Sequence, residues 1–194
     1  WRLKEDVERE ELWASIGADV RLMLETTEES DHDLAIARLV EIAALLTPPL
    51  KAHIGKTEQG KYTQFRRMTS DLPQRVVGMP KDARTIVEQI DVLWHNGGKG
   101  IVAAFEVERT TTIVSGIQRF RDLLAAAPEM DIALYIVVPK ERGNELRTKL
   151  GSPANRADGL HRKIGYIYLD DLQIRAKDAS GVDFEKIVRK MNGG

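Results

Sequence analysis

The sequence predicts an α/β fold, in which a mixed β-sheet is flanked by helices and preceded by a helical segment. Residues 89–112 contain two apolar-rich runs around Asn96-Gly97-Gly98-Lys99, a pattern typical of a β-hairpin. Residues 131–138 are almost continuously apolar, as in a strand buried on both faces. A helical pattern over 113–127 lies between them, so the strands before and after it should run parallel.

The first fifty residues predict two helices. Residues 2–25 carry an apolar stripe among many charges, and a second apolar stripe begins after a cap at Ser30 or Asp31 and ends before Pro48-Pro49. These helices could form an appended hairpin or could supply the first core helix. We therefore expect a helical segment over 1–50 and an α/β domain over 51–194.

The remaining segments are read from their periodicity and their turn residues. Residues 51–84 have no sustained period and contain three glycines and two prolines, so this region should be rich in loops. After the strand at 131–138 the expected elements are a helix at 140–150, a basic loop at 151–163, a strand at 164–169 and a short helix at 183–191. The alternation of helices and strands supports the α/β assignment.

Composition limits the class of protein. A chain of 194 residues with 42% hydrophobic and 30% charged side chains can bury a substantial core, as soluble globular proteins do. The absence of cysteine excludes disulfides and cysteine-ligated zinc. No apolar run approaches the roughly 20 residues of a membrane span and no signal peptide is visible, so we expect no membrane partner and a cytoplasmic location.

Charge is distributed unevenly although the net charge is only −1. Residues 1–33 contain four basic and eleven acidic side chains, whereas residues 51–84 contain eight and three, and residues 140–177 contain nine and five. The two basic segments flank the acidic hairpin in sequence. They could contact a phosphate backbone on either side of it, or they could simply be solvated.

The hairpin carries three carboxylates on one face. If Gly97-Gly98 is a two-residue loop, Asp91 lies opposite Ala104, with Glu106 on the diagonal, and alternation points Glu108 to the same side. The other side would be wholly apolar: Ile90, Val92, Trp94, Ile101, Ala103, Phe105 and Val107. Such carboxylates repel one another unless a cation neutralises them, and their hard oxygen atoms suit Mg²⁺ or Mn²⁺.

An aspartate that opens one strand, a Glu-x-Glu on the next strand and a helix after it resemble the PD-(D/E)XK restriction-endonuclease-like nuclease superfamily. In that pattern Asp91 and Glu106 match the two metal-binding acids. Glu108 falls where most members have the lysine that helps activate water, and Ile90 replaces the proline. The resemblance covers roughly residues 88–172.

This resemblance implies a restriction-endonuclease-like mixed sheet and a metal-dependent DNA endonuclease that hydrolyses phosphodiesters. Mg²⁺ or Mn²⁺ would be held by Asp91, Glu106 and the backbone carbonyl of Val107, with Glu108 as the third catalytic residue. Cutting of both strands by such domains generally needs two active sites, which suggests a homodimer. A role in restriction or phage defence is implied in the same way.

Candidate contacts to nucleic acid come from the first basic segment and from the region after the acidic strand. Cationic and polar side chains placed there can contact phosphate or orient water. Arg109 and Arg119 could also replace part of the missing lysine's charge. The candidate residues are Arg66, Arg67, Arg109, Ser115, Gln118 and Arg119.

Two other functions are consistent with the same pattern. The chain could be a nuclease-fold domain that has lost catalysis and binds DNA or a protein partner, and Glu108 in place of lysine favours this alternative. It could also be a structural α/β module whose acids form a solvated strand face. The intact pair of Asp91 and Glu106 favours the enzyme over both.

Overall fold

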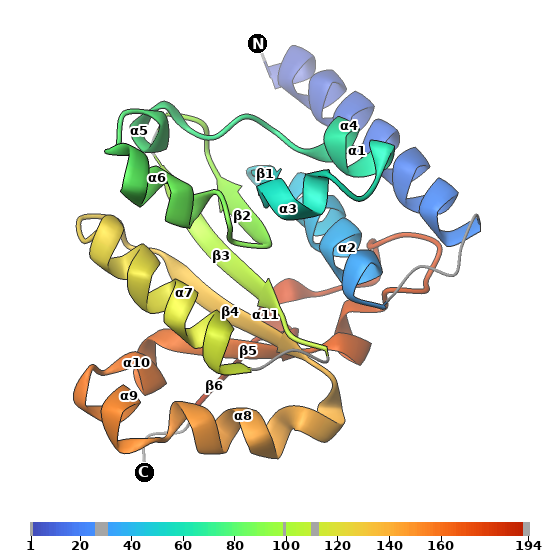
Figure 1. Cartoon of the computed structure of the whole chain (residues 1–194). Coiled ribbons are helices and arrows are strands. Elements are labelled where there is room, and N and C mark those ends of the chain that lie inside the picture. The colour runs from blue at the N-terminus through green and yellow to red at the C-terminus, as the bar shows by residue number, and fades with distance from the viewer. Residues whose placement is uncertain (1, 26–30, 99, 110–112, 192–194) are drawn as a thin grey trace.

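A computed structural model describes residues 2–25, 31–98, 100–109 and 113–191 of the chain. It contains one six-stranded mixed sheet with the strands in sequence order (Figure 1). The three central strands run parallel, while the first two and the last are antiparallel to their neighbours. The strands are β1 (Lys51–Ile54), β2 (Val92–His95), β3 (Ile101–Val107), β4 (Ala133–Val138), β5 (Ile164–Tyr168) and β6 (Arg189–Lys190). The predicted α/β fold is confirmed, and its architecture is consistent with a restriction-endonuclease-like fold.

Helices flank this sheet. The long ones are α1 (Arg2–Glu25), α2 (Asp31–Leu45), α7 (Ile113–Ala126) and α8 (Gly143–Leu150). The short ones are α3 (Lys56–Gln59), α4 (Thr63–Met68), α5 (Gln74–Val77), α6 (Lys81–Val87), α9 (Pro153–Ala157), α10 (Leu160–Lys163) and α11 (Phe184–Ile187). Two 3₁₀ turns, η1 (Lys140–Arg142) and η2 (Leu169–Leu172), complete the list of described helical elements.

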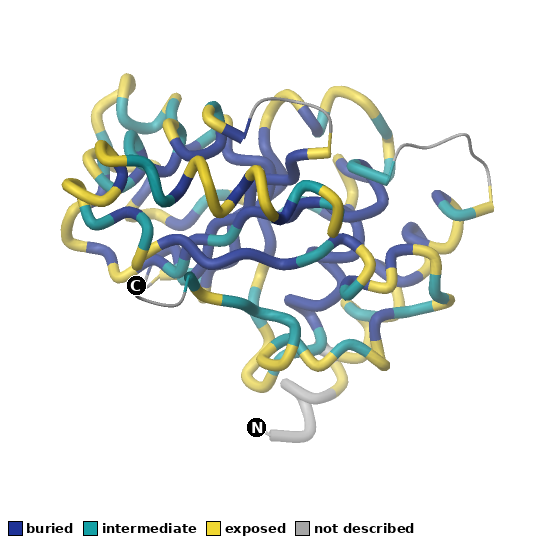
Figure 2. The backbone as a smooth tube through the Cα atoms, turned by 90° about the horizontal axis from the view of Figure 1, so that it is seen from below, coloured by how far each residue is buried: buried dark blue, intermediate teal, exposed yellow. Residues whose placement is uncertain are grey.

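Two apolar clusters cover the two faces of the sheet. In the first, α1 and α2 pack on one face with Trp94 and Phe105, and the Trp94 Nε1 donates to the carbonyl oxygen of Leu39 at 3.1 Å. In the second, α7 packs on the other face, where Phe120 joins Leu93 and Leu134. The central strands are accordingly buried along their length, while the exposed positions lie on the outer helices and turns (Figure 2).

α2 is part of the first cluster and does not project from the sheet. Its Arg38 and Glu41 are both fully buried and form an ion pair at 2.5 Å, and Arg38 also donates to the carbonyl oxygen of Ala176 at 2.6 Å. Of the two arrangements expected for the N-terminal helices, α2 takes that of a core helix. The division at residue 50 stays a prediction.

The hairpin forms, but the predicted register is wrong by two residues. Leu93, not Asp91, lies opposite Ala104, and Val92 lies opposite Phe105. A bulge between Trp94 and His95 pairs His95 with Ile101, so the connection is longer than the expected two-residue loop. Continued by one residue, this register sets Asp91 opposite Glu106. Because a shift of two keeps the side-chain alternation, the acids remain on the face that was predicted.

The predicted apolar face is correct for five of its seven members. Val92, Trp94, Ala103, Phe105 and Val107 join the cluster under α2. Ile90 and Ile101 belong instead to the cluster under α7. Ile90 precedes β2, and Ile101 lies beyond the bulge, where strict alternation no longer holds.

Three other local predictions are wrong. The supposed loop region 51–84 contains the edge strand β1 and four short helices, the supposed basic loop 151–163 contains α9 and α10, and the supposed helix at 183–191 is divided into α11 and β6. Elements of two to seven residues are too short to display a period, and they depend on packing for their stability. The two-residue loop would also pair Asn96 with Lys99, and Thr110 to Thr112 were expected to cap the helix that follows. Lys99 and residues 110–112 lie outside the described residues.

No helix in the described part of the chain combines the length and the apolar character needed to cross a membrane.

Candidate metal centre

Asp91 and Glu106 meet where β2 begins and β3 approaches its end. The backbone N–H of Val107 donates to Asp91 Oδ2 at 2.8 Å, which fixes the aspartate beside the acidic strand. Asp91 is 8% exposed and Glu106 is completely buried. The structure therefore brings together the two acids and Val107, the residue after Glu106, although the predicted register had placed Glu106 on the diagonal from Asp91.

Glu106 is held by a cation from the helix that crosses its face. Arg119 on α7 donates from Nε to Glu106 Oε1 at 2.7 Å and bonds Oε2 through Nη2. Burial raises the pKa of Glu106 well above its usual value, and the charge of Asp91 raises it further, whereas Arg119 acts in the opposite direction. The hydrogen bond to Glu106 likewise raises the pKa of Arg119.

Glu108 lies on the same face and is 1% exposed. Its Oε1 is 3.4 Å from Arg119 Nη2, so one guanidinium serves both carboxylates of the Glu-x-Glu pair. The backbone of Glu108 is fixed on both sides, since its N–H donates to Val137 at 2.8 Å and its carbonyl accepts from Arg142 Nη1 at 2.9 Å. This acid is therefore anchored within the site and is not a solvated strand residue.

A glycine on α7 allows the helix to pack this closely. A Cβ at Gly116 would lie 2.8 Å from Glu108 Oε1 and 3.3 Å from Glu106 Cβ. Any larger residue would force the carboxylate or the helix to move. The spacing of Gly116 and Arg119 by three residues places both on the helix face that covers the acids.

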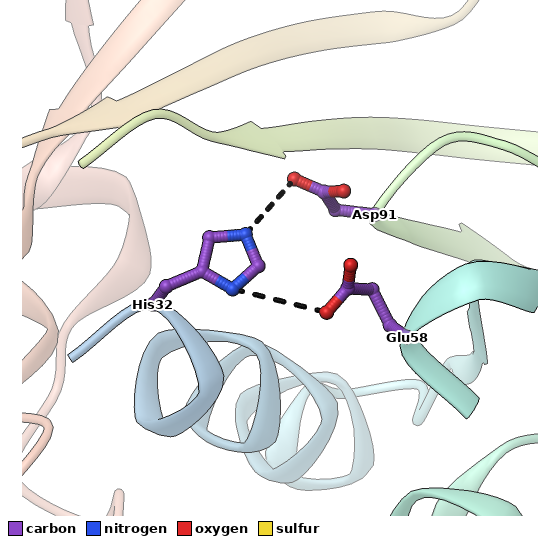
Figure 3. A group of neighbouring side chains, drawn as sticks. All are labelled: His32, Glu58 and Asp91. Carbon is purple, nitrogen blue, oxygen red and sulfur yellow. Dashed lines mark ion pairs between the residues drawn. The ribbon is translucent and has the colours of Figure 1, made fainter. Parts of the chain in front are cut away.

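The structure adds His32 and Glu58, which sequence reasoning missed. His32 Nε2 lies 3.7 Å from Asp91 Oδ2, and His32 Nδ1 lies 3.8 Å from Glu58 Oε2 (Figure 3). One ligand atom from each of His32, Glu58 and Asp91 falls within 4.8 Å of the other two, which is compatible with a shared metal ion. The three residues come from α2, α3 and the start of β2, so no local spacing in the sequence predicts that they come together.

Asp33 supports His32 from the same helix. His32 Nδ1 lies 3.0 Å from Asp33 Oδ1, and Asp33 in turn accepts from the Tyr62 hydroxyl at 2.9 Å and from Lys61 Nζ at 3.2 Å. Burial by itself would lower the pKa of His32. The hydrogen bond to Asp33, together with the nearby carboxylates of Asp91 and Glu58, outweighs burial and raises that pKa to about 9.

The predicted nucleic-acid contacts do not form one group. Arg66 and Arg67 lie on α4 and are exposed, and Arg67 donates from Nε to Asp19 on α1 at 3.1 Å. Arg109 is exposed after β3, with Nη2 3.5 Å from Asp31 Oδ2. Gln118 is exposed on α7 and donates to Asp122 at 2.8 Å.

Ser115 and Arg119, the other two candidates, are half-buried on α7. Arg119 differs from all the rest because it contacts the acids themselves. The set therefore divides into exposed side chains on α4, after β3 and on α7, the half-buried Ser115, and one arginine within the site.

Comparison with known proteins gives one family. A family model described as the Type II restriction enzyme NmeDI C-terminal domain matches residues 23–173, which is well over half of the chain. The matched region includes His32, Glu58, Asp91, Glu106 and Glu108. Neither a curated protein nor a solved structure matches the chain.

Proposed function

The chain belongs to the family of the Type II restriction enzyme NmeDI C-terminal domain, and on this premise we propose that it is a metal-dependent DNA endonuclease of the PD-(D/E)XK type. Asp91, Glu106 and the backbone carbonyl of Val107 would hold Mg²⁺ or Mn²⁺. Family membership supports a restriction-type nuclease. The variant of the motif, the metal requirement and the roles of these residues are parts of the proposal.

The observation that carries the proposal is the hydrogen bond from the N–H of Val107 to Asp91. Because Val107 follows Glu106, this bond holds Asp91 beside Glu106. Two buried carboxylates in one place are costly unless positive charge accompanies them, and their hard oxygen atoms fit Mg²⁺ or Mn²⁺. When bound, the ion would polarise the scissile phosphate and lower the pKa of a coordinated water.

The side chains around the pair would bind, orient and move protons. Glu108 would orient the attacking water and accept its proton, because it lies on the same face as Glu106 and replaces the usual lysine. Arg119 would offset part of the negative charge of Glu106 and Glu108, and would also stabilise negative charge on the phosphate. Arg109 would add positive charge at the end of the same strand.

The exposed candidates would position DNA. Arg66, Arg109 and Gln118 lie on the surface, where contacts to phosphate oxygens fix the register of a duplex without reading its sequence. Arg67 would have to exchange its partner Asp19 for a phosphate. A homodimer that cuts both strands stays a prediction.

Plasmid cleavage tests this function. The native chain, Glu106→Gln and the control Glu129→Gln would be compared with Mg²⁺, with Mn²⁺ and with EDTA. Glu129 is a suitable control because it is about half exposed and pairs with Arg75 at 3.3 Å, away from the acids. We expect metal-dependent cutting by the native chain and the control, and none by Glu106→Gln. Equal cutting by all three would refute the site.

A second candidate function is DNA or protein binding without catalysis. Glu108 in place of lysine and the full engagement of Glu106 by Arg119 favour it. If no protein cuts DNA under any metal condition while the native chain and Glu106→Gln bind it equally, this function replaces the nuclease.

A further inference from the structure

The carboxylate group around His32 is built like the outer layer of a metal site. Asp33 Oδ1 lies at hydrogen-bond distance from His32 Nδ1, and the Asp33 carboxylate is itself held by Tyr62 at Oδ2 and by Lys61 at Oδ1. An N–H at Nδ1 that donates to Asp33 leaves the lone pair of Nε2 directed away from Asp33. Metal-binding histidines commonly donate their second ring N–H to a carboxylate in this way.

The other ring nitrogen lies beside an acid without bonding it closely. His32 Nε2 is 3.7 Å from Asp91 Oδ2, beyond an ordinary hydrogen bond but within the span of two ligands on one ion. Asp91 Oδ2 already accepts from Val107 N–H, so the position of this carboxylate is set independently of the histidine. The gap between Nε2 and Oδ2 is thus fixed from both sides.

Glu58 supplies a third donor from a separate element. It is 8% exposed on α3, and Lys61 Nζ stands 2.5 Å from its Oε2. The single positive charge of Lys61 offsets the negative charge of only one of the three carboxylates Asp33, Glu58 and Asp91. A divalent cation bound at Nε2 would displace the second ring proton of His32. With the imidazole neutral, the group carries a net charge of about −2, which the cation would neutralise.

We propose that His32, Glu58 and Asp91 form a second cation site, beside that of Asp91 and Glu106, and that it takes a transition-metal ion such as Mn²⁺ in preference to Mg²⁺. The preference follows from the imidazole nitrogen, which transition metals accept and Mg²⁺ rarely does. Asp33 acts as a positioning residue that orients the ring. The inference extends the proposed function because Asp91 belongs to both sites.

Manganese itself is the probe, added to the full-length chain. Pulsed electron paramagnetic resonance detects coupling of bound Mn²⁺ to a ligand ¹⁴N nucleus. We expect this coupling in the native chain, and we expect His32→Gln to abolish it while the control His161→Gln retains it. Asp33→Asn should keep the coupling but weaken Mn²⁺ binding about 10- to 100-fold, as loss of such a supporting carboxylate does. Glu58→Gln should also weaken Mn²⁺ binding.

The same measurement on Glu106→Gln separates the two proposals. Nitrogen coupling that persists in this variant supports the second site whether or not the native chain cuts DNA. The absence of coupling in the native chain, or coupling that survives His32→Gln, overturns the second site even if cleavage depends on Glu106. Thermal melts in EDTA identify the folded variants, and if His32→Gln does not fold, loss of coupling in Glu58→Gln with its retention in Glu129→Gln decides the question.

Discussion

Arg119 on α7 bonds both carboxylate oxygens of Glu106 on β3, and the same guanidinium reaches Glu108. The crossover helix therefore supplies a positive charge to the acidic strand, which has Glu108 where the proposed PD-(D/E)XK motif would have lysine. Arg119 is thus also an ion-pair link between α7 and β3. This arrangement and the burial of His95 lead to five testable predictions.

Arg119→Ala should destabilise the metal-free protein. Breaking a fully buried ion pair costs about 3–5 kcal/mol. Because the Arg119 side chain is 32% exposed, we expect a smaller loss, about 1–3 kcal/mol. Urea unfolding in EDTA measures it, and Arg121→Ala on the same helix is the control, since Arg121 pairs with Asp158 away from the acids.

A divalent cation should partly rescue Arg119→Ala. With the guanidinium gone, Asp91, Glu106 and Glu108 have lost their strongest neighbouring positive charge, so Mg²⁺ should raise the melting temperature of the variant more than that of the native chain. Thermal melts with and without Mg²⁺ provide the comparison. An equal rise in both proteins, or none in either, would show that these acids do not share a cation.

Gly116→Ala should reduce cleavage more than stability. The added Cβ would meet Glu108 Oε1 at 2.8 Å, and this flexible carboxylate can move away, so the cost in unfolding free energy should be about 1–3 kcal/mol. The displaced Glu108 would no longer orient water. Cleavage rates and urea melts should be compared with Gly98→Ala, where an added Cβ has nothing within 4 Å. Full activity in Gly116→Ala would remove Glu108 from the mechanism.

His95 should make the fold sensitive to acid. Burial lowers the pKa of His95 to about 4, assisted by the charges of His53 and Lys51. Because the folded pKa lies below the unfolded value near 6.5, this histidine's contribution is complete above pH 6.5 and is lost as pH falls toward 4. The total loss of unfolding free energy from this histidine should be about 3 kcal/mol.

The variant His95→Gln should flatten the dependence of the unfolding free energy between pH 6.5 and 4. His95 Nε2 lies 2.7 Å from Ser70 Oγ, and its Nδ1 accepts from the N–H of Gly97 at 3.2 Å, so the variant will also lower stability at neutral pH. The slope, not the absolute value, is the readout. His161→Gln on α10 is the control and should keep the native slope.

Glu106→Gln tests the candidate metal centre of Asp91 and Glu106 through its effect on cleavage. Removing a charge that stabilises the transition state typically lowers a rate by about 100-fold or more. We expect a loss of at least that order in plasmid cleavage, with a folded protein by circular dichroism. Cleavage at the native rate would show that Glu106 is not required for catalysis. His32, Glu58 and Asp91 would then be the next residues to substitute.

Local sequence patterns were enough to predict the α/β class, the hairpin, the crossover through α7 and the face shared by Asp91, Glu106 and Glu108. Each of these depends on a local period or on turn chemistry, which neighbouring residues encode. Even the wrong register preserved that face, because an error of two residues leaves side-chain alternation unchanged.

The charges that surround the acids depend on how distant segments pack together. Arg119 was one of several polar candidates until packing of α7 around Gly116 placed it on Glu106. His32 and Glu58 lie 59 and 33 positions before Asp91 and reach it only because α2 and α3 fold against the start of β2. Contacts between distant segments leave no period in the sequence, so burial, ion pairing and any shared metal site depend on how the whole chain packs.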